Sequence, residues 1–118
     1  MHAPALLAEK ITFVDRDCGL SPEGRLAALE KLSRFVERHA AVARLAVEME
    51  RKPQGAAPEE EFIAKGELEL GGPGTFTSVG ASDPLQALEF LLAKFERQLR
   101  RHRGHSARMA TVPALATP

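Results

Sequence analysis

The sequence predicts an α+β domain, a two-layer βαβββα sandwich in which a four-stranded mixed sheet carries two helices on one face. Three observations predict it. The hydrophobic period changes along the chain in the order strand, helix, three strands, helix. Each predicted helix has a single apolar stripe, and the predicted strands have a single apolar face. Such surfaces are buried together when both helices pack on the same side of the sheet.

The chain begins this order with a strand and a helix. Ile11-Thr12-Phe13-Val14 is rich in β-branched and aromatic residues, which favours a strand. Ser21-Pro22-Glu23 supplies an N-cap, a proline at the first helical position and an acid in the first turn, so a helix is predicted to about His39. The predicted inner side of this helix holds Leu26, Leu29, Leu32, Phe35 and Val36. Its predicted outer side holds Lys31, Arg34 and Arg38.

Three strands are predicted next, because residues 42–50 and 62–70 alternate between apolar and polar side chains. The segment 51–58 and the acids Glu59-Glu60-Glu61 separate the first two strands. Gly71-Gly72-Pro73-Gly74 predicts a turn, and residues 75–79 form the last strand. The polar face of the sheet is predicted to be acidic, with Glu48, Glu50, Glu67 and Glu69.

The last helix is predicted over residues 83–103. Asp83 can accept amide hydrogens of the first turn, Pro84 suits the first helical position, and Gly104 follows a basic last turn. At about 100° per residue, one side is apolar, with Leu85, Leu88, Leu91, Leu92, Phe95 and Leu99. The opposite side carries Phe90, Lys94, Arg97 and Arg101. Solvation explains such a charged face, but cations beside an exposed ring also predict contact with nucleic acid or with a protein.

The 118 residues, 44% of them hydrophobic, suffice for one core. Residues 10–104 are predicted to form a single domain between a flexible N-terminus at 1–9 and a disordered tail at 105–118. The single Cys18 excludes an internal disulfide and favours a reducing compartment.

Neither a signal-like start nor an apolar run of membrane length is present, so we expect a cytoplasmic protein without a membrane partner.

The formal net charge is zero, but its distribution is uneven. Residues 1–40 carry six basic and six acidic residues, residues 41–82 carry four and seven, and residues 83–118 carry six and three. The corresponding net charges are 0, −3 and +3. Any polyanion is therefore expected to meet the helices and not the sheet.

The chain resembles a known family over roughly residues 10–103. The resemblance lies in the βαβββα order, Leu20-Ser21-Pro22 before the first helix, Ala81-Ser82-Asp83 before the second, Ala87 within it, and the helix ending at 94–103. These features are similar to the ribosome hibernation promoting factor family, also labelled ribosome-associated inhibitor or sigma-54 modulation protein. The resemblance implies a short-form, non-enzymatic member that binds the small ribosomal subunit near the decoding centre. There it would exclude messenger and transfer RNA, and so silence translation in starved or resting cells as a stress response.

Carried over by position, the resemblance gives a set of ribosomal RNA-binding residues on the two helices. They are Lys31, Arg34 and Arg38 on the first helix and Lys94, Arg97, Arg100, Arg101 and Arg103 on the second. Phe90 joins them because it shares the cationic side of the last helix. The resemblance implies no cofactor and no small-molecule substrate.

Other motifs do not predict an active site. Gly71-Gly72-Pro73-Gly74 lacks the Gly-Lys-Ser/Thr ending of a phosphate loop. His102 and His105 share a helical spacing, but no carboxylate or cysteine completes a metal-ligand set. The acids near Cys18 should raise the pKa of its thiol, which argues against a nucleophile. No catalytic or metal-binding residue is predicted, and an enzyme assembled from scattered residues is the weakest of three hypotheses.

The second hypothesis is a protein-interaction or regulatory module that has this fold but has lost ribosome binding. The zero net charge, the acid run at 59–61 and the exposed Phe90 favour it. The start of the last helix also departs from the family, which usually has a Met-Tyr pair after the acid where this chain has Pro84-Leu85.

Overall fold

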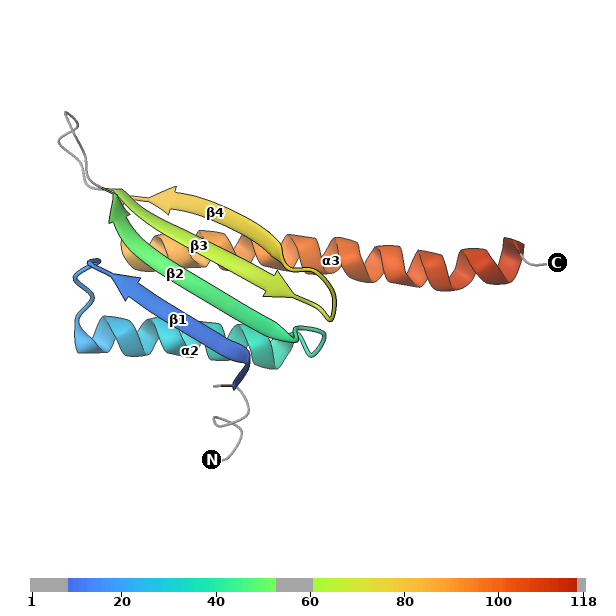
Figure 1. Ribbon diagram of the computed structural model, residues 1–118, viewed down its shortest axis with the longest axis horizontal. Coiled ribbons are helices and arrows are strands. Elements are labelled where there is room, and N and C mark those ends of the chain that lie inside the picture. Colours follow the sequence, from blue (N-terminus) through green and yellow to red (C-terminus); the bar gives the residue numbers. More distant parts are fainter. Residues whose placement is uncertain (1–8, 53–60, 117–118) are drawn as a thin grey trace.

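A computed structural model describes residues 9–52 and 61–116, with side chains as far as residue 102. Strand β1 (Ile11–Arg16) leads into helix α2 (Pro22–Arg38), and strands β2 (Arg44–Lys52), β3 (Glu61–Glu69) and β4 (Thr75–Ala81) precede helix α3 (Pro84–Ala116). Figure 1 shows both helices on one side of the sheet and running in the same direction. The predicted α+β fold with its mixed sheet is confirmed.

The sheet has four strands in the order β1-β2-β3-β4. Strand β1 pairs with β2 in parallel, whereas β2 pairs with β3 and β3 with β4 antiparallel. A parallel pair needs a crossover connection, and α2 provides it. The other connections return directly, so β1 and β4 are left as the two edges.

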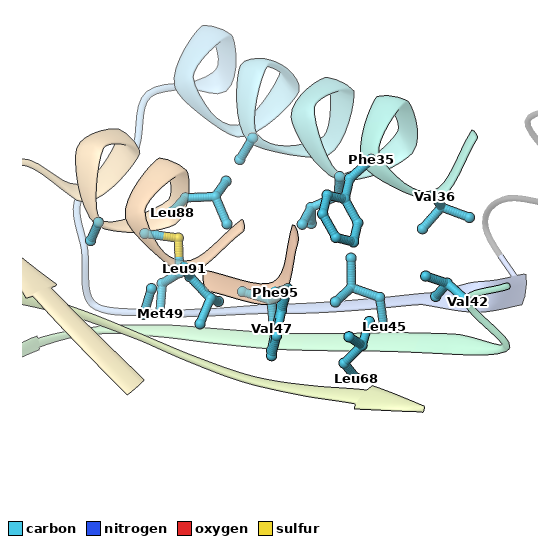
Figure 2. Close-up of a cluster of buried hydrophobic side chains, with 14 of the residues drawn as sticks. Phe35, Val36, Val42, Leu45, Val47, Met49, Leu68, Leu88, Leu91 and Phe95 are labelled. Carbon is cyan, nitrogen blue, oxygen red and sulfur yellow. The ribbon is translucent and has the colours of Figure 1, made fainter. Parts of the chain in front are cut away.

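The core lies between the helices and the sheet. Phe35 of α2 and Leu88, Leu91 and Phe95 of α3 point toward the sheet, whose inner face is formed by alternate strand residues (Figure 2). The buried strand residues are Leu45, Val47, Met49, Phe62, Ala64 and Leu68. Their alternation is the period-two pattern that the sequence predicted for β2 and β3.

Both predicted helix starts are confirmed in their atomic contacts. The amide of Gly24 donates to Oγ of Ser21 at 2.9 Å, and the amide of Gln86 donates to a carboxylate oxygen of Asp83 at 3.0 Å. Each cap satisfies an amide of a first turn that has no partner within the helix. The predicted end of α2 at His39 is also confirmed, because this residue caps the helix.

Two helix predictions need correction. Leu26 was expected on the inner side of α2, but 66% of its surface is exposed. At about 100° per residue it lies roughly 130° from the direction shared by the buried Ala28, Leu32, Phe35 and Val36. The end of the last helix, predicted at Arg103 before Gly104, is also wrong, because α3 continues to Ala116. A glycine inside a helix costs only about 1 kcal/mol, and the strong helix formers Ala107, Arg108, Met109 and Ala110 follow within one turn or two.

Several predicted segments lie wholly or partly outside the described residues. Residues 1–8 of the predicted flexible N-terminus are among them, as are Glu59 and Glu60 of the acid run. The side chains of residues 103–116 are not described either, so the division into a domain at 10–104 and a tail at 105–118 stays a prediction.

Candidate nucleic-acid interface

The outward side of α3 carries four exposed side chains in one line, which we call the α3 stripe: Phe90, Lys94, Arg97 and Arg101. Their spacing of four, three and four residues keeps them on one side of a helix. Phe90 exposes 47% of its surface. In the part of the chain whose side chains are described, none of the three cations has an ion-pair partner. The stripe can therefore offer its charges to an external anion without first breaking a contact.

The opposite side of α3 fixes the orientation of this stripe. Leu88, Leu91, Phe95 and Leu99 are fully or almost fully buried against the sheet. Gln98 adds a polar contact, because its side-chain amide donates to Oγ1 of Thr77 on β4 at 3.0 Å. Rotation of the helix would expose these apolar groups, so packing holds the stripe outward.

The cations of α2 are placed differently from the sequence prediction. Lys31 and Arg38 lie on the flank of α2 that faces α3, not opposite the core. Lys31 Nζ lies 2.7 Å from a carboxylate oxygen of Glu89, and Arg38 Nη1 lies 3.8 Å from one of Glu96. Arg34 is mostly exposed and has only Glu30 of its own helix, at 4.0 Å. Acids of α3 thus lie between the cations of α2 and the α3 stripe.

A shallow groove of about 240 Å³ lies between the helices, with the ion-paired residues along its sides. Phe35, Leu92 and Ala93 contribute apolar surface to it. The buried His39 closes the end of α2, with its ring 4.7 Å from that of Phe35 and its Nε2 3.9 Å from Glu96. The charged side chains that line the groove thus already have ion-pair partners within the protein.

Two further predicted residues lie near the end of the described side chains. Arg100 is exposed on α3, about 60° from Arg97 on the side toward α2. Arg103 belongs to the helical backbone, but its side chain lies outside the described residues. The structure therefore gathers Phe90, Lys94, Arg97 and Arg101 on one surface, with Arg100 beside it.

The uncovered face of the sheet carries the predicted acids, but two of them are neutralised. Arg16 pairs with Glu48, and Lys65 pairs with Glu50 at 3.3 Å. Glu67 and Glu69 have no ion-pair partner among the described residues. Anions are still disfavoured here, although less strongly than the count of glutamates suggested.

A hollow of about 550 Å³ on this face was not predicted. It lies across all four strands, and its mainly apolar lining includes Val14, Ala46 and Phe76. Phe76 exposes 75% of its surface. The sequence contained one signal of this apolar surface. Phe76 stands at an outward position of β4, where a strand that faces solvent usually has a polar residue.

Cys18 is buried in the loop after β1. Its burial is the main reason that the pKa of the thiol is raised to about 12, and its hydrogen bond with the Asp15 side chain and the Asp15 charge raise it further. The predicted direction is confirmed, although burial outweighs the neighbouring acids that the prediction invoked. A thiol of this kind is not a nucleophile at neutral pH.

Metal ligation and membrane insertion have no structural support within the described ranges. No group of three or more histidine, cysteine or acidic residues there could hold a metal ion. His102 is exposed on α3, and the side chain of His105 is not described. Over residues 9–52 and 61–116, no helix combines the length and the apolar character that a membrane span requires.

Comparison with known proteins identifies the fold. One similar structure is a ribosomal subunit interface protein from Coxiella burnetii, with a TM-score of 0.63 and 17% sequence identity over 80% of this chain and 97% of the other. Another is the N-terminal domain of Protein Y from Thermus thermophilus, with a TM-score of 0.56 and 18% identity over 77% of this chain and 94% of the other. Neither a protein-family model nor a curated protein sequence matches the chain. These comparisons establish a shared fold that spans nearly the whole length of both solved chains.

Proposed function

We propose that this chain is a ribosome-associated translation inhibitor, a cytoplasmic hibernation factor that binds ribosomal RNA of the small subunit through exposed basic residues of its helices. It acts by binding and not as an enzyme. The observation that carries the proposal is the α3 stripe, which has three exposed cations without ion-pair partners among the described residues. The fold shared with a ribosomal subunit interface protein supports the choice of partner.

The chemistry of the stripe suits RNA. Lys94, Arg97 and Arg101 can each donate hydrogen bonds to phosphate oxygens, and arginine can do so in a bidentate manner. Phe90 stands one helical turn before Lys94 and can stack on an unpaired base. Such contacts release counterions from the RNA, so binding must weaken as salt is raised.

The test is co-sedimentation of the purified protein with ribosomes from its own source, at low and at raised salt. We expect binding that fades with salt and that is lost when Arg97, Arg100 and Arg101 are replaced by glutamate. The matched control replaces three exposed cations away from α3, namely Arg16, Arg44 and Arg51, by glutamate. The proposal is wrong if the α3 variant occupies ribosomes as well as the unchanged protein does.

A second candidate is a protein-interaction module that does not bind ribosomes. The uncovered sheet face favours it, because a mainly apolar hollow with Phe76 at its edge is the kind of surface that a protein partner covers. Absence of the protein from the ribosomal pellet even at low salt, together with a stable ribosome-free complex that the Phe76→Ser variant no longer forms, would favour this candidate.

A further inference from the structure

We infer that Glu89 and Glu96 of α3 confine RNA binding to the α3 stripe, by holding Lys31 and Arg38 of α2 in ion pairs that a phosphate would otherwise take. The inference rests on the proposed function and separates Lys31 and Arg38, which acids of α3 hold, from the exposed cations of the α3 stripe. Arg34, which has only Glu30 of its own helix at 4.0 Å, belongs to neither set.

The two ion pairs follow from matched spacing on neighbouring helices. Lys31 and Arg38 are seven residues apart on α2, and Glu89 and Glu96 are seven residues apart on α3. Because the helices run in the same direction (Figure 1), the same two-turn step brings both pairs together. The repeat thus places two ion pairs, two helical turns apart, along the contact between α2 and α3.

The distance in the first pair makes it the stronger one. Lys31 Nζ is 2.7 Å from Glu89, within hydrogen-bond distance, whereas Arg38 Nη1 is 3.8 Å from Glu96. Each pair has one side chain about one third exposed and one more than half exposed, so solvent screens the two pairs to a similar degree. A phosphate approaching Lys31 would have to displace Glu89 and would meet its charge.

The second pair is tied to the helix end. Glu96 lies 3.8 Å from Arg38 and 3.9 Å from the ring of the buried His39. A change at Glu96 would therefore disturb the cap of α2 as well as the charge. Glu89 contacts only Lys31 in the described ion pairs, so it is the residue to vary.

The experiment measures the dissociation constant for purified small ribosomal subunits as a function of KCl. The variants are Glu89→Gln, Lys31→Gln and the two combined, with Glu37→Gln as the control for loss of one acid. Glu37 is exposed on α2 and has no ion-pair partner among the described residues. The Arg97→Gln/Arg101→Gln variant tests the proposed function in parallel, and urea unfolding confirms that each variant is folded.

We expect Glu89→Gln to tighten binding about five- to tenfold and to steepen the salt dependence by about one phosphate contact, since it frees one cation. Glu37→Gln should change affinity by no more than about twofold, because it removes an exposed acid that holds no cation among the described residues. Lys31→Gln should change little by itself, yet it should cancel the gain when combined with Glu89→Gln.

Three results would overturn the inference, and they separate the role of Glu89 from the proposed function. If binding requires Arg97 and Arg101 but Glu89→Gln behaves like Glu37→Gln, only the role of Glu89 is wrong. The same holds if Lys31→Gln weakens the unchanged protein as much as it weakens the Glu89→Gln variant. If the Arg97→Gln/Arg101→Gln variant binds normally, the proposed function fails and the inference with it.

Discussion

Cys18 shows how burial decides the chemistry of a single side chain. Cys18 is 4% exposed, and burial raises the pKa of its thiol from the ordinary value of 9.0 to about 12, so the thiol of the folded protein stays protonated at pH values above 9. The unfolded chain releases this proton at lower pH than the folded chain does. Stability contributed by Cys18 is therefore complete below about pH 9 and is lost as the pH rises toward 12.

We predict that the free energy of unfolding of the unchanged protein falls faster above pH 9 than that of a Cys18→Ala variant. The excess slope approaches about 1.4 kcal/mol per pH unit, since one proton is released on unfolding. Urea titrations between pH 7 and pH 10.5 measure both slopes. Parallel slopes across that range would show that the buried thiol is not coupled to folding.

At the scale of elements, the contact between β3 and α3 depends on a residue without a side chain. A Cβ placed on Gly66 would lie 2.8 Å from the Phe95 ring and 3.0 Å from Leu91. Both partners are fully buried, so neither can move freely. Gly66 thus lets α3 lie close to the sheet, which in turn holds the α3 stripe outward.

We predict that Gly66→Ala destabilises the protein by about 1–3 kcal/mol through overpacking. Gly72→Ala is the control, because a Cβ there meets nothing within 4 Å. It should change stability by no more than about 0.5 kcal/mol. Urea unfolding of the two variants at neutral pH makes the comparison, and equal stabilities would contradict the predicted contact with Phe95.

The same elements show what could and could not be predicted from the sequence. Periodicity and caps identified every strand and both helix starts, because each of these signals is local. Leu26 was assigned to the buried side of α2 because it is apolar. The first turns of this helix carry leucines on more than one side, and only the position of the sheet decides which of those sides is buried. The pairs of Lys31 with Glu89 and Arg38 with Glu96 were missed for the same reason. Their shared seven-residue spacing was the available signal, but it has meaning only once the helices are known to lie parallel.

Across the whole molecule, the net charge is zero, but the helix side and the sheet side differ in the charges that they expose. The helix side presents cations of α3 without ion-pair partners among the described residues. The sheet side pairs Arg16 and Lys65 with acids and leaves Glu67 and Glu69 unopposed. A polyanion that approaches the molecule should therefore bind one side only, and local charge should outweigh the total.

We predict that Lys94→Gln and Lys65→Gln differ in ribosome binding although each removes one positive charge. Lys94 is exposed on the α3 stripe, so its loss should weaken binding several-fold and reduce the slope of log affinity against log salt by about 0.7–0.9. Lys65 lies on the sheet face beside Glu50, and its loss should leave the slope unchanged. Sedimentation with purified ribosomes over a range of KCl concentrations measures both slopes. Equal reductions would mean that total charge, and not the helix side, governs binding, because each variant removes one positive charge.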